Sequence, residues 1–342
     1  MLFRSSNVLT IDGNGENDSA LLGVLRDGVF EVLGRKRAPE SLGGLYSNVT
    51  HQLGFVRHVE EGKTMGLAPY GKSVVDIPGV RIREGTYDMA RRYLSSGFWD
   101  HVDTPRHDGE PIEERHQNMA ASAQGVLEEA GMALARGLHK NTNIRTLCLA
   151  GGVALNCDMN AKILSLDCVD NVFIQPAAHD AGTALGAAIE VASRHGEPTD
   201  FVMEHAYWGP EYSSYEIKSF LDEAKIQYSR PSDIEQAVAE RLAAGDIVGW
   251  FQGRMEIGPR ALGARSILAN PSMAEMKDKV NAEVKHREGW RPFAPSMLEE
   301  EASNLVFDSY PSPFMLLTFT VRPEWRDMLR ASMHVDNTVP DR

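Results

Sequence analysis

Residues 253–295 concentrate cations on a backbone that cannot continue as one regular helix or strand. Three arginines, and further on a lysine with two more arginines, lie among glycines and prolines, which interrupt both periodicities. We therefore expect tight turns that gather several guanidinium groups. Such groups suit an oxyanion with several oxygens, because each planar fork donates paired hydrogen bonds. The cations are Arg254, Arg260, Arg265, Lys285, Arg287 and Arg291.

The chain as a whole is acidic, so the basic character of this segment is local. The 342 residues include 35 Lys and Arg against 48 Asp and Glu, a formal net charge of −13. General nucleic-acid or membrane-surface binders usually carry a positive field, so this balance argues against both classes. A locally basic segment then indicates a binding site. The alternative, that the arginines form ordinary ion pairs with the many acidic side chains, stays open on the residues alone.

The length, the cysteines and the hydropathy of the chain limit the classes of protein to which it can belong. The length favours two domains, and a polar break at residues 197–200 places the boundary at 203/204. Cys148, Cys157 and Cys168 lack metal-ligand spacing and cannot all pair, so reduced thiols in the cytoplasm are the simplest account. No apolar run approaches the ~20 residues of a membrane span, and the first residues carry no signal-peptide pattern. We expect a cytoplasmic protein.

A three-stranded meander is predicted at the start of the chain, where apolar, β-branched stretches alternate with turn residues. The stretches span residues 7–12, 20–25 and 29–33. Asp12, Gly13 and Gly15 lie at the end of the first stretch, where a glycine-rich turn can bring backbone amides to a phosphate group. A plain hairpin turn is the alternative here.

Residues 60–71 combine three glycines with one lysine, Lys63, and show little periodicity. This composition predicts a loop that lies against a ligand rather than an element of the core. An ordered connection with a surface lysine is the alternative.

A long helix is predicted from Pro111, because glutamates occupy its first turn and an apolar stripe follows at helical spacing. The stripe, which we expect to be buried, comprises Met119, Ala123, Leu127, Ala130, Leu134 and Leu138.

A strand at residues 145–150, the pair Gly151 and Gly152, and a helical run containing Asn156 follow in that order. A strand, two glycines and a helix bring bare backbone close to a flat or anionic ligand. After a further strand at 172–175, Asp180 stands at the entry of a small-residue helix, at 183–192, that can pack closely. Asp180 would either cap that helix or face nucleotide phosphates or a metal.

The second part of the chain begins with two predicted amphipathic helices, at residues 214–225 and 234–244. A strand at 246–252 then leads into the arginine segment.

Together these segments resemble the NodU/CmcH-type O-carbamoyltransferase family. The resemblance runs in family order over about residues 7–336. The matching stretches read LTIDGNGE (9–16), SLGGLY (41–46), EGKTMGLAPYG (61–71), LAGGVALNC (149–157), AAHDAGTALGAA (177–188) and the two arginine motifs. The resemblance implies an α/β fold in two parts. Residues 1–203 would form an actin/Hsp70-like, Kae1-like ATPase domain, and residues 204–342 a partial YrdC-like domain around a basic cavity.

The resemblance also implies a two-step reaction. Carbamoyl phosphate and ATP give carbamoyl adenylate and pyrophosphate in the second domain, and the carbamoyl group then passes to a hydroxyl of a small-molecule acceptor, such as a sugar or natural product, in the first. Fixed guanidinium groups would neutralise and orient carbamoyl phosphate. This set comprises Arg254, Arg260, Arg265, Arg287 and Arg291.

In the first domain, by the same resemblance, Gly151, Gly152 and Asn156 would hold the adenosine of ATP. Asp12, Gly13 and Gly15 would lie near its phosphates, and Lys63 would join the nucleotide-binding set. Asp180 would be a ligand of a divalent metal, iron or magnesium, that could polarise the carbamoyl group.

The sequence departs from the family pattern at both ends. The family has an earlier segment with a His-x-x-x-His metal pair, which this sequence lacks, and a longer second domain. We therefore expect an incomplete metal site, uncovered sheet edges, and self-association or poor solubility. A non-catalytic nucleotide-binding fragment, or half of a split carbamoyltransferase with a partner chain or in a homo-oligomer, is the alternative. Threonylcarbamoyl transfer to tRNA fits less well, since the chain is acidic and no nucleic-acid or membrane partner is expected.

Overall fold

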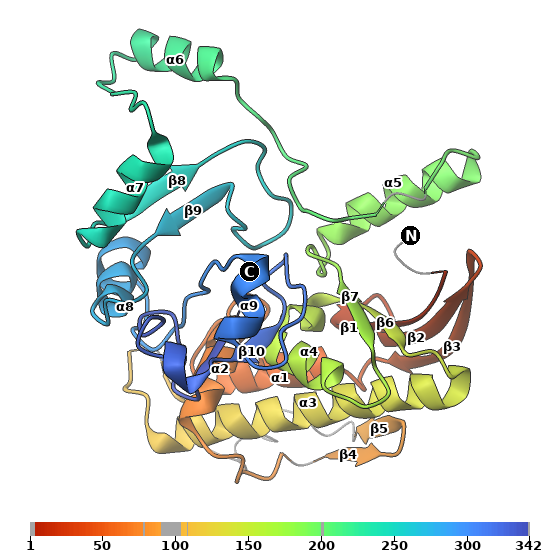
Figure 1. Cartoon of the computed structure of the whole chain (residues 1–342). Helices are drawn as coiled ribbons and strands as arrows, with labels where there is room; N and C mark the ends of the chain where they lie inside the picture. The colour runs from red at the N-terminus through yellow and green to blue at the C-terminus, as the bar shows by residue number, and fades with distance from the viewer. Residues whose placement is uncertain (1–3, 78, 90–103, 108, 200–201, 341–342) are drawn as a thin grey trace.

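The computed structural model describes residues 4–77, 79–89, 104–107, 109–199 and 202–340. Its first part is built on a five-stranded mixed sheet with strand order β3-β2-β1-β6-β7 (Figure 1). The strands are β1 (Ser5–Gly15), β2 (Asp18–Arg26), β3 (Val29–Arg37), β6 (Thr146–Ala150) and β7 (Asn171–Ile174). The chain is therefore a mixed α/β protein, as predicted at that level.

The predicted meander is confirmed. β1 pairs antiparallel with β2, and β2 with β3, while β1, β6 and β7 run parallel to one another. The register of β1 against β2 shifts between Ile11 and Gly15, so the strand is irregular at Asp12. Leu9 and Ile11, which precede this irregularity, are fully buried. The irregularity thus frees the backbone at the end of a strand that is otherwise anchored in the core.

Three helices lie against the sheet on the side where α3 (Glu114–Thr142) runs beneath the strands (Figure 1). The other two are α1 (Leu42–Gln52) and α4 (Cys157–Leu164). The long helix and its stripe are confirmed, because all six predicted stripe residues of α3 are at most 3% exposed. A capping box between Glu113 and His116 starts the helix, and Asn143 ends it in a left-handed conformation.

The loop predicted at residues 60–71 is wrong, because α2 (Glu61–Leu67) is helical and continues into a 3-10 turn at Ala68–Tyr70. One of the glycines that suggested a loop serves close packing, because a Cβ at Gly71 would lie 2.1 Å from the Gln117 carbonyl oxygen, whereas Gly62 has open space around it. A Cβ atom at Gly66 would lie 3.5 Å from the ring of Trp290, far along the chain. Tertiary contact therefore stabilises a helix that the local composition does not favour.

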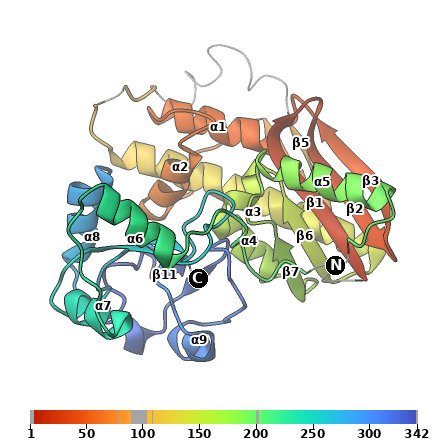
Figure 2. The ribbon, with the colours of Figure 1, turned by 90° about the horizontal axis from the view of Figure 1, so that it is seen from above.

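The small-residue helix forms as α5 (Gly182–Arg194), but the expectation that it packs closely is wrong. None of its residues is buried, and it lies on the side of the sheet opposite α3 (Figure 2). Small side chains permit close packing, but they do not supply a partner.

The second part of the chain begins with the predicted α6 (Ser214–Glu223) and α7 (Ile234–Ala243), followed by a hairpin of β8 (Val248–Phe251) and β9 (Arg265–Leu268). Neither helix buries a residue, and α6 stands away from the sheet (Figure 1). The remaining elements are β4 (Val80–Arg83), β5 (Thr86–Met89), a 3-10 turn at Gly152–Leu155, α8 (Met276–Lys279), a π-helical turn at Val280–Lys285, α9 (Glu299–Leu305), β10 (Thr318–Thr320), a 3-10 turn at Pro323–Trp325 and β11 (Thr338–Pro340).

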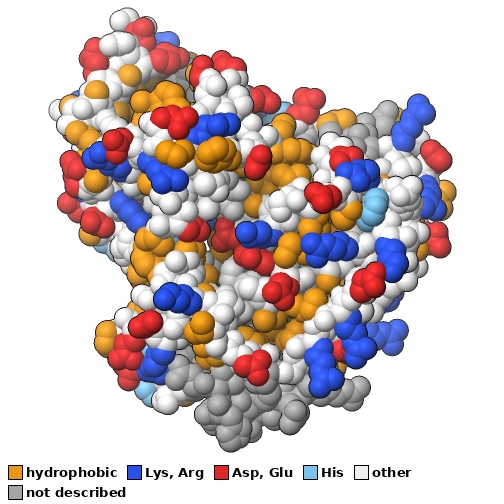
Figure 3. Space-filling model, turned by 60° about the horizontal axis from the view of Figure 1, so that its bottom comes forward, with side chains coloured by type: hydrophobic (Ala, Val, Ile, Leu, Met, Phe, Trp, Pro, Cys, Tyr) orange, Lys and Arg blue, Asp and Glu red, His pale blue; other side chains and the backbone are white. Residues whose placement is uncertain are grey.

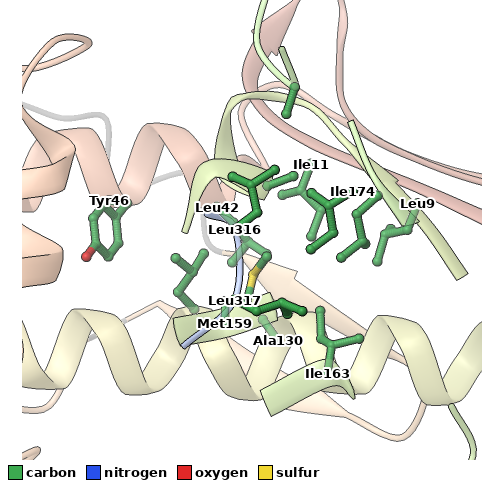
Figure 4. Packing of buried hydrophobic residues seen from close by; sticks show 14 of the residues in the cluster. Leu9, Ile11, Leu42, Tyr46, Ala130, Met159, Ile163, Ile174, Leu316 and Leu317 are labelled. Atoms are coloured by element: carbon green, nitrogen blue, oxygen red, sulfur yellow. The ribbon is translucent and has the colours of Figure 1, made fainter. Parts of the chain in front are cut away.

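The last segment returns to the core of the first part. Leu316 and Leu317 belong to the same buried cluster as Leu9 and Met159 (Figure 4). The amide of Asn160 donates to the Leu316 carbonyl oxygen at 2.9 Å, which fixes this segment on α4. The boundary at 203/204 stays a prediction, and one buried core draws on residues from both sides of it.

The surface carries charges of both signs. On the face shown in Figure 3, basic and acidic side chains are interspersed and separated by apolar patches. Within the described ranges, none of the helices combines the length and apolar character needed to cross a bilayer. The three cysteines are free thiols.

Candidate functional site

The carboxyl ends of the parallel strands β1, β6 and β7 meet at one edge of the sheet, where ligands bind in many α/β proteins. Two predicted motifs come together there. The Asp12 carboxylate accepts the N–H of Gly13 at 2.6 Å and that of Gly152 at 3.1 Å. The turn after β1 and the glycine pair after β6 therefore form a single structure.

Glycine is required where these segments touch. Gly151 has a φ of +90°, and a Cβ there would lie 2.2 Å from the Ile11 carbonyl oxygen. Gly43, in the first turn of α1, approaches as closely, since its Cβ would lie 2.6 Å from the Gly13 nitrogen. The edge therefore presents closely packed bare backbone. Gly15 lies apart from this contact and pairs with Asp18 across the β1–β2 turn.

Asn156 is engaged in the fold itself. Its side chain caps α4 by accepting the Met159 N–H at 2.9 Å and exchanges two hydrogen bonds with Gln124, at 2.9 and 3.0 Å. Gln124 also accepts the Tyr46 hydroxyl at 2.8 Å. Contact between Asn156 and adenosine stays a prediction. The supporting role of Gln124 was missed, because nothing local distinguishes it on α3.

Asp180 is exposed and does not cap α5, so the capping interpretation is wrong. The N-cap position is Ala181, and Asp180 contributes only its carbonyl oxygen, to Thr183. Among the residues described, no group of three or more His, Cys, Asp or Glu side chains could hold a metal ion. Metal binding through Asp180 stays a prediction, and these residues do not by themselves fit a divalent metal.

The first arginine motif, residues 253–265, contacts this edge of the sheet. The Arg260 guanidinium donates to the Leu155 carbonyl oxygen at 3.4 Å, just beyond the glycine pair. Gly258, with a φ of +91°, approaches so closely that a Cβ would lie 2.8 Å from the Pro176 carbonyl oxygen. Arg254 points elsewhere and donates to the Gly209 carbonyl oxygen. Arg260 is therefore the arginine that the fold brings to the sheet edge.

A carboxylate that sequence reasoning missed lies inside the same motif. Glu256 pairs with Arg265 at 3.1 Å, and its side chain is 0% exposed. Burial opposes its charge, but backbone N–H donors outweigh burial and lower the pKa of Glu256 below its usual value. An acidic residue inside a glycine-rich basic segment was the signal available. The ion-pair alternative thus holds for Arg265.

The second arginine motif is built around Asn281. The Asn281 side chain accepts the Arg287 Nε–H at 2.6 Å, and the Arg287 guanidinium lies 4.7 Å from the ring centre of Phe293. Burial and the neighbouring charge of Arg291 lower the pKa of Arg287 to about 10. The pKa of Lys285 is lowered by burial and by these two arginines. Three mutually repelling cations favour a bound anion.

Lys63 belongs with this second motif. Its ammonium contacts Glu60 at 2.7 Å and Glu288 at 2.6 Å. Although burial works against the charge, these two carboxylates raise the pKa of Lys63. A cavity of about 780 Å³ opens beside it, lined in part by Phe55 and Trp290. Lys63 therefore ties α2 to the second arginine motif, and its contact with a nucleotide stays a prediction.

Two family comparisons cover most of the chain. The carbamoyltransferase N-terminus model matches residues 2–189, and the carbamoyltransferase C-terminus model matches residues 239–340. The chain belongs to the carbamoyltransferase family. The first match contains the sheet edge, and the second contains both arginine motifs.

Curated relatives agree with this assignment. Nodulation protein NolNO of Sinorhizobium fredii is 40% identical over 98% of this chain and 51% of its own length. Nodulation protein NolO of Bradyrhizobium diazoefficiens is 40% identical over 98% of this chain and 63% of its own length. Nodulation protein U of Rhizobium tropici is 36% identical over 65% of this chain and 38% of its own length. The chain thus spans between half and two thirds of the NolNO and NolO proteins.

Proposed function

We propose that the chain acts in the two-step transfer of a carbamoyl group to a hydroxyl of a small-molecule acceptor. Water would hydrolyse carbamoyl phosphate to carbamate and phosphate, and the carbamate oxygen would attack the α-phosphorus of ATP to release pyrophosphate and leave carbamoyl adenylate. The acceptor hydroxyl would then take the carbamoyl group and release AMP. The observation that carries this proposal is the docking of Arg260 beside the glycine pair at the sheet edge.

The sheet edge would bind the nucleotide. The backbone of Gly151 packs directly against the Ile11 carbonyl oxygen, and the adenosine would lie beside this glycine pair. The buried Nε of Arg260 has no acceptor within the described part of the chain. Buried donors are nearly always satisfied, so an oxygen of carbamoyl phosphate, held next to the nucleotide, would complete the arginine.

The second arginine motif supplies further cations for carbamoyl phosphate. Arg287 is held by Asn281 and Phe293 before any ligand binds, so it need not reorganise when charge develops on phosphate oxygens. Arg291 lies close enough to Arg287 to lower the pKa of Arg287. Arg287 in turn lies close enough to Lys285 to lower the pKa of Lys285. We derive no step through a metal ion, because the described residues do not form a site for one.

A second candidate is a nucleotide-binding chain that is inactive alone, or half of an enzyme completed by a partner. It predicts that ATP binds without turnover, and that activity is recovered only on adding a second chain.

The test is pyrophosphate release from ATP that depends on carbamoyl phosphate. We expect Arg260→Ala to lose this activity by about a hundredfold, as removal of a fixed charge donor does in other enzymes. Arg194→Ala, at an exposed arginine paired with Glu190 on α5, is the matched control and should match the unmodified chain. Unchanged pyrophosphate release by Arg260→Ala would show that Arg260 is not part of the site.

A further inference from the structure

The first arginine motif is folded around the carboxylate of Glu256. One carboxylate oxygen, Oε1, accepts three backbone N–H groups, from Leu262 at 2.6 Å, Ala264 at 2.8 Å and Arg265 at 3.3 Å. The other oxygen, Oε2, accepts the Arg265 Nε–H at 3.1 Å. A single side chain therefore closes residues 256–265 into a loop.

The backbone that carries Glu256 is fixed on both sides. Ile257 donates its N–H to the Ala206 carbonyl oxygen at 2.8 Å, and the Met255 carbonyl oxygen accepts the Gly209 N–H at 2.8 Å. The carboxylate thus projects from an anchored segment into the loop that it closes. Without it, three backbone N–H groups would be left to find other partners.

Closing the loop decides where its arginines stand. Arg265 is held at the base, since its second donor reaches the Gly258 carbonyl oxygen at 3.3 Å. Arg260 lies between Glu256 and the residues that the carboxylate binds, so it projects from the closed part of the loop to Leu155. The carboxylate of Glu256 pairs with Arg265 and with backbone N–H groups. No carboxylate is paired with Arg260 among the described ion pairs.

We propose that Glu256 is a positioning residue. By closing residues 256–265 into a loop, it holds Arg260 at the sheet edge, where the arginine can bind an oxyanion. This rests on the proposed function, since it assumes that carbamoyl phosphate is bound by these arginines. Glu256 itself would touch no substrate. Its carboxylate acts through the backbone of the loop and through Arg265.

The experiment is calorimetric titration of carbamoyl phosphate and, separately, ATP into the full chain and its Glu256→Gln variant. Glutamine keeps the length of the side chain but loses the charge and places an NH2 group against Arg265 or the loop amides. We expect carbamoyl phosphate to bind about tenfold more weakly, the effect of losing a charge-assisted hydrogen bond, and ATP affinity to change by less than about twofold. Glu235→Gln, an exposed glutamate on α7, is the matched control.

Equal affinity of Glu256→Gln and the unmodified chain for carbamoyl phosphate would overturn the proposal. If the unmodified chain binds ATP but no carbamoyl phosphate, the proposed function fails separately. Amide exchange then tests the loop by itself, also where Glu256→Gln does not fold. The amide protons of Leu262 and Ala264 should exchange slowly in the unmodified chain, and exchange as fast as at exposed positions 211 and 212 would show that the carboxylate does not hold the loop.

Discussion

Replacing Asp158 by asparagine should make the protein more stable, and increasingly so as the pH rises. Asp158 lies in the first turn of α4 and accepts the Thr318 hydroxyl at 2.9 Å. Burial raises the pKa of Asp158 to about 6, and the carboxylates of Glu128 and Asp336 add to the effect. In the unfolded chain an aspartate titrates near 3.9, so the folded state binds the proton more tightly, by about 2 pH units.

The sign follows from which state holds the proton. Below about pH 4 the carboxyl is protonated in both states and has no effect on stability. As the pH rises through about 6, the folded state must accept a buried charge, and up to about 3 kcal/mol of stability is lost. The asparagine of the variant cannot ionise, yet its amide oxygen can still accept the Thr318 hydroxyl. About half of the loss is already present at pH 5, so the advantage of Asp158→Asn should grow by about 1.5 kcal/mol between pH 5 and pH 8.

Urea unfolding followed by circular dichroism at both pH values measures this difference. Asp167→Asn makes the same change at an exposed position just after α4 and is the matched control. An advantage of Asp158→Asn that stays constant or shrinks from pH 5 to pH 8 would refute the reasoning. It would mean that Asp158 is not held in a buried, carboxylate-rich environment.

Three further outcomes follow from the packing. Gly151→Ala should destabilise the fold by at least about 1–3 kcal/mol and abolish ATP binding, while Gly186→Ala on α5, which has open space around the new Cβ, should do neither in thermal unfolding and calorimetry. In a double-mutant cycle on unfolding free energies, Lys63→Met and Glu288→Gln should couple by about 1 kcal/mol, and additive effects would exclude a stabilising ion pair. Val32→Lys, on the exposed edge strand β3, should lower the self-association that we expect for the chain in light scattering, and an unchanged particle size would exclude this edge as the contact.

Elements whose evidence is local were predictable. The stripe of α3 repeats at helical spacing over six residues, and the meander alternates apolar stretches with turn residues, so both were recognised and both are confirmed. The helix α2 was not predicted, because its two glycines obscure the helical periodicity of its apolar residues. It contacts distant residues, since Gly66 lies near the Trp290 ring and Lys63 pairs with Glu288, and no window of sequence around α2 contains them.

The candidate site was predictable in its residues and not in its arrangement. The motifs correctly singled out the glycine pair and both arginine segments as regions of close backbone contact and concentrated charge. They did not separate Arg260, which reaches the sheet edge, from Arg265, which is paired with a buried carboxylate. Glu256 and Asn281 were missed because each is an ordinary polar residue until the loop folds around it.

The sequence by itself determined the family, the order of the motifs and the strands and helices whose side chains repeat with a clear period. These properties depend on residue identity and on spacing along a few turns of chain. Tertiary structure alone decided which cation lies near which carboxylate, that Lys63 joins α2 to the second arginine motif, and that Asp158 is half-buried and hydrogen-bonded to Thr318 of the returning C-terminal segment. The energy of a charge depends on burial and on neighbours a few ångströms away. For Lys63 and Glu288, and for Asp158 and Thr318, those neighbours come from segments more than a hundred residues apart.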